Sequence, residues 1–157
     1  APGSPAAGTR RADLVAANLA ALGLPASAAC TVLFGGMLPQ SALAAADQTL
    51  FQIDDGTDAN RLRLRNAAGG ANILAGRVTA GAASDAAALG AITPGTPFRL
   101  AVALNGAGRV AASLNGGAVG AAAGGPAAGL TTFRIGNAAA AAAPLAGEVG
   151  TVSVLPY

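Results

Sequence analysis

The segment that most constrains the fold is FRLAVALNGAGRVAASLNGG, residues 98–117. Two apolar runs of strand length flank Asn105–Gly108, and the second run closes on Asn115–Gly117. Asparagine and glycine suit tight hairpin turns, so this spacing predicts a strand, a turn and an antiparallel strand. Apolar residues alternate with small or polar ones along each run, which indicates strands with one buried face.

Short runs of the same kind recur along the chain, with turn residues between them. In Arg61–Arg65 leucines and arginines alternate strictly, which places the leucines inward and the arginines outward. About ten such strands predict an all-β fold, a two-sheet antiparallel β-sandwich with no helix of three turns. The expected strands are 31–38 (with a bulge or kink at Gly35–Gly36), 49–54, 61–65, 72–79, 86–92, 98–104, 109–114, 132–135 and 147–155.

Alanine and glycine dominate the composition, so the core must rely on close backbone contacts and a few large side chains. The expected anchors are the four phenylalanines, Phe34, Phe51, Phe98 and Phe133. Inside the sandwich we expect Phe51, Leu62, Leu64, Phe98, Leu100 and Ile135.

The N-terminal region allows two interpretations. Residues 1–11 are small and rich in proline, which is typical of a linker or an ordered arm, and 12–157 is expected to form a single domain. Residues 12–18 are expected to form a strand, followed by a helical turn over 19–24. The alternative is a continuous helix from Asp13 to Leu22, because alanine and leucine favour helices.

The absence of histidine excludes several kinds of active site. Ser-His-Asp and Cys-His arrangements and histidine-containing zinc sites cannot form, and no phosphate-binding glycine motif is present. Two carboxylates for glycoside hydrolysis could come from Asp54, Asp55, Asp58 or Glu148. Their spacing does not place a pair across a bond, and tryptophan platforms are lacking. We expect a protein without enzymatic activity, and assign no catalytic, cofactor-binding or metal-binding residue.

The charge pattern argues against two partner classes. All nine basic residues are arginines, only 10% of the chain is charged, and Arg10–Arg11 and Arg61–Arg65 form the only basic clusters. Nucleic-acid binders need a denser basic stripe, so no nucleic-acid partner is expected. The charge-free stretch from Val110 to Phe133 contains glycine, asparagine and proline, so membrane insertion is not expected either.

Cys30 is the single cysteine, so an intramolecular disulfide is excluded. Its neighbours are apolar or β-branched, which predicts a buried and unreactive thiol in a strand. No histidine exists to activate it.

Two polar segments are candidates for binding. Residues Asp54–Asn60 carry three carboxylates and an amide, which could supply oxygen ligands to Ca²⁺, but aspartate and asparagine also form turns through their own backbone, and we favour that role. Arg61, Arg63 and Arg65 could bind an acidic glycan or another anion. We favour a solvated outer face that discourages edge-to-edge aggregation.

Three stretches carry a family resemblance. TPFRLAVALNGAGRVAASLNGG, FRIGNAAAAAAPLAGEVGTVSVLPY and QTLFQIDDGTDANRLRLR together resemble laminin G-like domains, whose fold is the concanavalin A-like jelly roll. The resemblance covers about residues 30–157, and its motifs are structural ones of turns and pleats. It departs from the family where Pro97–Arg99 replace a Trp-His pair. Alanine-rich versions without lysine resemble domains of phage tail fibres and other virion-surface proteins.

The resemblance implies a non-enzymatic module on the outer surface of a phage or phage-like particle. The first hypothesis is adhesion to a host-surface glycan. The alternative is a capsid or tail decoration protein that binds other virion proteins, and an enzyme acting on polysaccharide is a third, disfavoured hypothesis. The outward face of the 98–117 hairpin carries mostly alanine and serine, so we expect a second layer of this chain or a neighbouring subunit to cover it. A homo-oligomer, such as a trimer, would place a subunit there.

Overall fold

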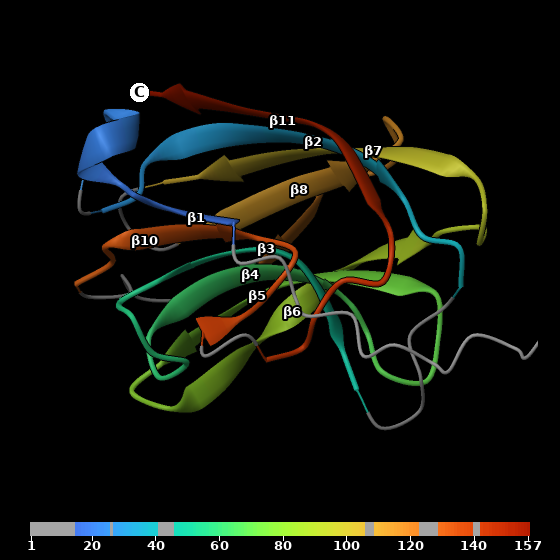
Figure 1. Cartoon of the computed structure of the whole chain (residues 1–157), viewed down its shortest axis with the longest axis horizontal. Helices are drawn as coiled ribbons and strands as arrows, with labels where there is room; N and C mark the ends of the chain where they lie inside the picture. The colour runs from blue at the N-terminus through green and yellow to red at the C-terminus, as the bar shows by residue number, and fades with distance from the viewer. Residues whose placement is uncertain (1–14, 26, 41–45, 106–108, 123–128, 140–141) are drawn as a thin grey trace, which may run out of the picture.

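Two antiparallel β-sheets packed face to face form the fold (Figure 1). The computed structural model describes residues 15–25, 27–40, 46–105, 109–122, 129–139 and 142–157. Within these residues the helical content is one 3-10 turn, η1 (Ala20–Leu22). The predicted all-β, two-sheet antiparallel sandwich is confirmed.

The two sheets differ in size, and every neighbouring pair of strands is antiparallel. The six-stranded sheet consists, in spatial order, of β1 (Val15–Asn18), β10 (Thr132–Ile135), β3 (Gln48–Asp54), β4 (Arg61–Asn66), β5 (Asn72–Thr79) and β6 (Ala82–Ala91). The five-stranded sheet consists of β11 (Glu148–Pro156), β2 (Cys30–Met37), β7 (Pro97–Leu104), β8 (Val110–Leu114) and β9 (Gly120–Ala122).

Most strands lie where the sequence predicts them, and three differences have physical causes. β6 begins four residues earlier than expected, because Ala80 and Gly81 both adopt positive φ angles (49° and 79°) and make a two-residue hairpin. β9 is three residues long and was not predicted, since its Gly-Ala-Ala sequence carries no β-branched residue. At the N-terminus the structure has a strand and a 3-10 turn, so the alternative of a continuous helix is wrong over the described residues.

The bulge predicted within 31–38 lies instead in the facing strand. Gly36 pairs with Val149 and Gly35 pairs with Thr151, which leaves Gly150 as the extra residue of β11. A Cβ atom on Gly36 would lie 2.6 Å from the carbonyl oxygen of Glu148. The glycines of β2 therefore allow a close approach of β11 rather than a bend in β2 itself.

Four phenylalanine rings form a row that crosses the interior from one sheet to the other. Ring centroids are 6.1 Å apart for Phe98 and Phe34, 6.4 Å for Phe34 and Phe51, and 5.5 Å for Phe51 and Phe133. The first two rings belong to the five-stranded sheet and the other two to the six-stranded sheet. All four are buried, as predicted for the anchors of an alanine-rich core.

The expected core residues are buried with one exception. Phe51, Leu62, Leu64, Phe98 and Leu100 are all 3% exposed or less. Ile135 packs against the core but is only partly buried, because β10 lies next to the edge strand β1. The leucines of β4 point inward and its arginines outward, as the alternation predicted.

The outward face of the β7–β8 hairpin is not covered by the described part of the chain. Leu100, Val102 and Leu104 are buried, whereas Ala101 is exposed and Ala103 is half-buried. A second layer of this chain was one expected cover, and the described residues do not supply it. Coverage by a neighbouring subunit stays a prediction.

Two expectations concern the ends and the membrane. The expected boundary between an arm, 1–11, and a domain from residue 12 lies outside the described residues. Among the residues described, no helix has the length and apolar character needed to cross a bilayer.

The buried thiol gives a testable pH dependence. Cys30 is 0% exposed, and burial raises its pKa from the ordinary value of 9.0 to about 11. Above pH 9 the unfolded chain loses the thiol proton while the folded chain keeps it, so the free energy of unfolding should fall between about pH 9 and pH 11. We expect a loss of roughly 2 to 3 kcal/mol from this group, measured by urea denaturation.

Cys30→Ala provides the control, since it should flatten the slope of stability against pH in that range. Native protein should also resist thiol reagents at pH 8. Rapid and complete labelling of the folded protein would contradict the assigned burial.

Candidate functional site

The acidic loop that the sequence singled out is largely engaged in internal contacts. Asp54 ends β3 and is 0% exposed. Its carboxylate accepts hydrogen bonds from Arg134, at 2.7 and 3.2 Å, and from the backbone N–H of Gly56, at 2.9 Å. Arg134 lies on β10, the neighbouring strand, 80 positions along the chain, and only 15% of its side chain is exposed. The pair is a largely buried salt bridge that joins the two strands.

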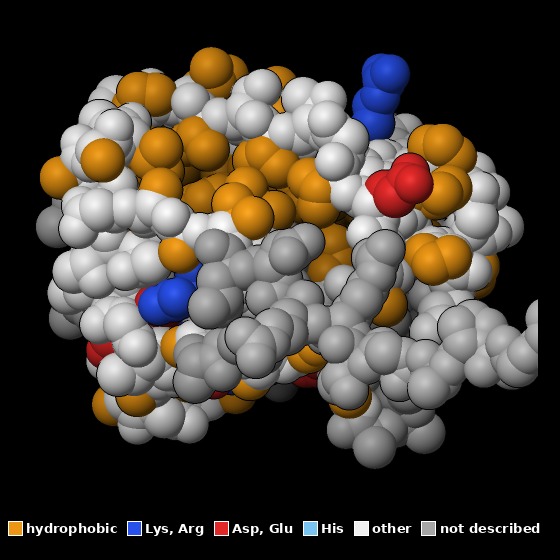
Figure 2. Space-filling model, in the orientation of Figure 1, with side chains coloured by type: hydrophobic (Ala, Val, Ile, Leu, Met, Phe, Trp, Pro, Cys, Tyr) orange, Lys and Arg blue, Asp and Glu red, His pale blue; other side chains and the backbone are white. Residues whose placement is uncertain are grey.

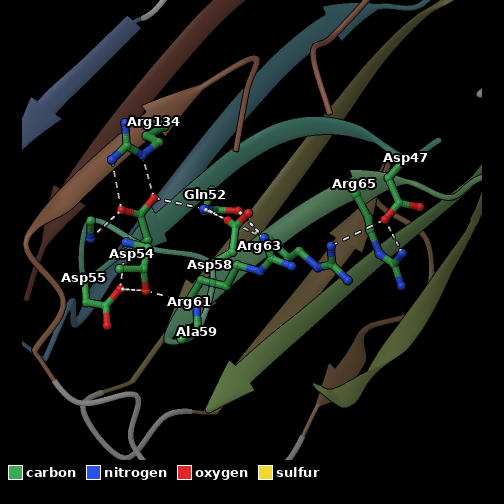
Figure 3. Close-up of polar contacts among 12 residues, drawn as sticks. Asp47, Gln52, Asp54, Asp55, Asp58, Ala59, Arg61, Arg63, Arg65 and Arg134 are labelled. Carbon is green, nitrogen blue, oxygen red and sulfur yellow. Dashed lines mark hydrogen bonds and ion pairs between the residues drawn. The ribbon is translucent and has the colours of Figure 1, made fainter. Parts of the chain in front are cut away.

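The remaining groups of the loop continue this network along the outer face of the six-stranded sheet (Figure 3). Gln52 donates from Nε2 to Asp54, at 2.9 Å, and to Asp58, at 3.0 Å. Asp58 also forms an ion pair with Arg61. Asp55 accepts hydrogen bonds from the Thr57 hydroxyl, the Asn60 amide and the Thr57 backbone N–H, which hold the pKa of its carboxyl below its usual value.

Asp54 and Asp55 accept hydrogen bonds from backbone N–H groups two residues on, which is the turn role we favoured over cation binding. The ion pairs of Asp54 and Asp58 were not predicted. Within the described residues no group of three carboxylate, thiol or imidazole side chains gathers in a geometry suited to a metal ion. A Ca²⁺ ion at 54–60 would have to displace Arg134 from Asp54 or Arg61 from Asp58. The contacts of this loop therefore give no geometric support to calcium binding, the alternative that we did not favour.

The arginines of β4 are not the solvated outer face that we favoured. They point outward, but their side chains are only 15 to 17% exposed. Arg63 and Arg65 both form ion pairs with Asp47, and Arg61 pairs with Asp58. Asp47 precedes β3, and antiparallel pairing of β3 with β4 brings it beside the two arginines.

The contacts of Asp47 lower the pKa of its carboxyl group. Burial disfavours its charged form, but a hydrogen bond from the backbone N–H of Ala68 and the hydrogen bond and charge of Arg65 outweigh this effect, with a smaller contribution from Arg63. As a result the pKa of the Asp47 carboxyl lies below its usual value. The arginines are therefore committed to their own chain and do not form a free anion-binding surface.

A groove of about 790 Å³ on the outer face of the five-stranded sheet was not predicted. It lies where β2 and β8 end and β7 and β11 begin. Its floor contains Gly35, Gly36 and Gly150, so backbone rather than side chain forms the bottom. A Cβ atom on Gly35 would have no neighbour closer than 3.9 Å, so the absence of a side chain leaves open space there. The other lining residues are Met37, Pro97, Phe98, Arg99, Asn115, Glu148, Val149 and Thr151.

Two charged side chains in this groove lack the internal partners that other charges have. Arg99 and Glu148 are exposed, and neither side chain makes a hydrogen bond or ion pair within the described part of the chain. Among the arginines described, Arg109 is the only other one whose side chain is exposed and makes no hydrogen bond or ion pair, and it lies outside the groove.

The turn after β8 orders one wall of the groove. Asn115 has a φ of 52° and exchanges two hydrogen bonds with Arg99: its Oδ1 accepts from the Arg99 N–H at 2.8 Å, and its own N–H donates to the Arg99 carbonyl oxygen at 2.8 Å. The backbone of Arg99 is thereby fixed, while its guanidinium stays accessible. The Asn115 Nδ2 group keeps both of its donors for other partners.

A second, more apolar depression of about 430 Å³ continues the groove along the sheet. It shares Gly35, Arg99 and Thr151 with the first and extends to Leu33 and Ala101. Two residues of the alanine-rich outward face of β7 and β8, Ala101 and Ser113, therefore line an elongated recess. Sequence reasoning missed the groove because its residues come from β2, from β7 with the turn after β8, and from β11, which are far apart in the chain.

The structure does not bring the four candidate acids together. Glu148 lies on the five-stranded sheet, whereas Asp54, Asp55 and Asp58 lie at the end of β3 and in the following loop of the six-stranded sheet. Glu148 is the single carboxylate among the described residues that line the groove.

Comparisons with known proteins support the fold. No protein-family model matches the chain, and no curated protein matches it. Among solved structures, the CBM40 domain of the Ruminococcus gnavus IT-sialidase, bound to α2,3-sialyllactose, matches with a TM-score of 0.65 and 13% identity, covering 87% of this chain and 79% of that chain. Sheep galectin-11, in complex with glycerol, matches with a TM-score of 0.55 and 14% identity over 94% and 100%.

A heptameric pentraxin from Limulus polyphemus matches with a TM-score of 0.55 and 13% identity over 80% of this chain and 63% of that chain. At these identities the matches establish the fold alone. The fold is a jelly-roll β-sandwich, consistent with the concanavalin A-like architecture that the family resemblance implied.

The buried ion pair yields a stability prediction. Asp54→Asn keeps the size of the side chain but leaves Arg134 without its counter-charge in a site that is 15% exposed. We expect the free energy of unfolding to fall by about 3 kcal/mol, because breaking a buried pair strands the other charge. Asp55→Asn is the matched control, and its partly exposed carboxylate should contribute no more than about 1 kcal/mol. Equal effects of the two substitutions in urea denaturation would contradict this assignment.

Proposed function

We propose that this domain is a non-catalytic adhesion module that binds glycan in the glycine-floored groove. The observation that carries the proposal is the pair of unpartnered charges, Arg99 and Glu148, in a groove whose bottom is backbone. Sugars present hydroxyl groups that both donate and accept hydrogen bonds. An exposed guanidinium supplies donors and an exposed carboxylate supplies acceptors for them.

The remaining lining residues suit the same ligand class. Met37, Pro97 and Val149 offer apolar contact to the C–H faces of a sugar ring, and Thr151 and Asn115 add polar groups. The glycine floor lets a ring approach the backbone closely. The solved structures of similar fold include a sialidase carbohydrate-binding module with bound sialyllactose, which supports glycan as the ligand class.

We further propose that the module acts on the exterior of a phage or phage-like particle and meets the glycan on a host surface. The support is the alanine-rich, lysine-free sequence and its resemblance to virion-surface domains. Immunogold labelling of intact particles tests this location. A gene position beside tail or capsid genes would support it further.

The second candidate is a decoration protein that binds other virion proteins or further copies of itself. It is favoured by the uncovered face of Ala101 and Ala103, because small side chains allow another protein backbone to approach. Ala103→Glu distinguishes the two candidates, because Ala103 lies on that face but does not line the groove or its apolar continuation. If the protein is a decoration protein, this substitution should abolish its assembly on particles. If it is an adhesion module, the glycan binding that depends on Arg99 should stay unchanged.

Binding in the groove predicts two effects on affinity. Gly35→Leu would fill the groove floor without a backbone clash, since the nearest atom to its Cβ lies 3.9 Å away, and should abolish binding. Arg99→Gln should weaken binding about tenfold, the value of one hydrogen bond to a charged group. The measurement is titration with 3′-sialyllactose and lactose by NMR, after screening on a glycan array.

The controls are matched in chemistry. Gly70→Leu adds the same side chain in open space, in the turn between β4 and β5 of the other sheet. Arg109→Gln removes a second exposed arginine. Both should bind like the wild type. Binding that is equally strong in Gly35→Leu would show that glycan does not enter this groove, and no binding to any arrayed glycan would refute the proposed function.

The absence of catalysis is also open to direct measurement. Glycoside hydrolysis uses two carboxylates across the scissile bond, and the groove offers Glu148 alone among the residues described. We expect no release of sugar from sialyllactose or from a polysaccharide panel in long incubations. Turnover that is lost in Glu148→Gln, or on amide substitution of Asp54, Asp55 or Asp58, would establish an enzyme.

A further inference from the structure

β11 is an edge strand whose free side is available for pairing. It spans nine residues and, among the strands that the structure describes, pairs only with β2, so it ends the five-stranded sheet. In an antiparallel sheet, alternate residues of an edge strand direct N–H and C=O groups away from the sheet. Within the described part of the chain no strand pairs with that side of β11.

An apolar crevice lies directly beside this edge. Figure 2 shows hydrophobic side chains gathered in a hollow between the positions of β11 and β1 in Figure 1. The crevice has a volume of about 190 Å³ and lies between the edges of the two sheets. It is lined by Val15, Ala16, Ala17, Leu22, Phe133, Ile135, Val152 and Val154, without a polar or charged residue. The core is thus incompletely closed on this side, which explains the partial exposure of Ile135, Val152 and Val154.

The middle of β11 lacks the features that usually prevent edge-to-edge pairing. Natural edge strands carry charges, proline or bulges, or are very short. In β11 these features are confined to the two ends: Glu148 and the Gly150 bulge at the start, and Pro156 at the finish. Residues 151–155, Thr-Val-Ser-Val-Leu, are β-prone and uncharged. Of the other edge strands described, β1 and β9 have only four and three residues, and β6 has two register shifts.

We propose that 151–155 pairs antiparallel with the same segment of a second copy of this chain, about a two-fold axis at Ser153. The pairing places Val152 opposite the partner's Val154, so apolar side chains meet on the crevice side. Thr151 lies opposite the partner's Leu155 on the outward face. No like charges come together along these residues. The segment is therefore complementary to itself, as a two-fold interface requires.

The dimer joins the two five-stranded sheets into one continuous sheet and covers both crevices. It differs from the hypothesis of contact through the alanine face, because the edge provides backbone hydrogen bonds and the uncovered core residues provide apolar area. It also leaves the grooves open. Gly150 and Thr151 of β11 border the groove, so both grooves lie on the same face near the axis.

That arrangement has a consequence which rests on the proposed function. Two grooves held side by side bind an array of glycans more tightly than one groove does, because the second contact is made within the same complex. The dimer itself does not depend on the identity of the ligand. The two claims can therefore fail separately.

Sedimentation velocity of the whole chain over a range of concentrations is the first test. The wild type should form dimers. Ser153→Lys should shift the equilibrium toward monomer by about fivefold or more, because it sets two lysines directly opposite each other at the axis. Ser153 is half-buried and lies on the outward face of β11, so the fold should be kept, which circular dichroism checks.

Disulfide trapping gives a positive result for the same geometry. Cα atoms of directly opposed residues in antiparallel strands are about 4.5 to 5.5 Å apart, within the range of a disulfide. Ser153→Cys should therefore cross-link into a covalent dimer on mild oxidation, while Cys30 stays buried and unreactive. Ala101→Cys, on the exposed face of β7, is the matched control and should stay monomeric on a denaturing gel.

Three outcomes would overturn the proposal: a wild type that is monomeric at every concentration, a dimer that survives Ser153→Lys, or cross-linking through Ala101→Cys in place of Ser153→Cys. Failure of the proposed function has a different signature. In that case the dimer would form and no glycan would bind. If both claims hold, Ser153→Lys will keep the affinity for soluble sialyllactose and lose the avidity for an immobilised glycan surface.

Discussion

The row of four phenylalanine rings is the contact on which the rest of the structure depends. In a chain dominated by alanine and glycine, few side chains are large enough to reach from one sheet to the other. Phe98 and Phe34 on one sheet and Phe51 and Phe133 on the other bridge that distance with centroid separations of 5.5 to 6.4 Å. The candidate groove lies on the opposite side of the same strands, because Gly35 follows Phe34 and Arg99 follows Phe98 with reversed orientation. The strands that carry Phe34 and Phe98 on their inner side therefore also form the floor of the groove on their outer side.

The two outer faces use charge in different ways. On the six-stranded sheet, carboxylates and guanidinium groups pair with one another, so that even outward arginines are mostly buried. On the five-stranded sheet, Arg99 and Glu148 keep their charges exposed and unpaired within the described residues. A paired charge contributes to the fold, whereas an unpaired one in a recess is available to a ligand. This contrast locates the candidate site more clearly than the number of charges does.

Sequence reasoning predicted what depends on neighbours in the chain. The alternation in Arg61–Arg65 predicted which side chains face inward, and the asparagine and glycine residues predicted where strands end. It failed for contacts across strands. Asp47 lies 18 positions from Arg65 and Asp54 lies 80 positions from Arg134, so nothing local indicated that these charges would be paired rather than solvated. The turn at Ala80–Gly81 was missed for a related reason, since alanine adopts a positive φ there only because the two flanking strands impose it.

The groove and the free edge have a common origin in the glycines around the start of β11. Gly36 allows the Glu148 carbonyl to approach, and Gly147 has space for no side chain, because its Cβ would lie 2.6 Å from the Met37 carbonyl oxygen. These contacts fix the first residues of β11 against the end of β2. After the bulge at Gly150, β11 pairs with β2 without a further register shift from Thr151 to Pro156. One side of that start borders the groove, and the regular part that follows forms the unprotected edge. Ligand binding and self-pairing would therefore use adjacent parts of β11. Close backbone contacts at Gly36 and Gly147 fix the position of this strand, and a side chain at either glycine would prevent them.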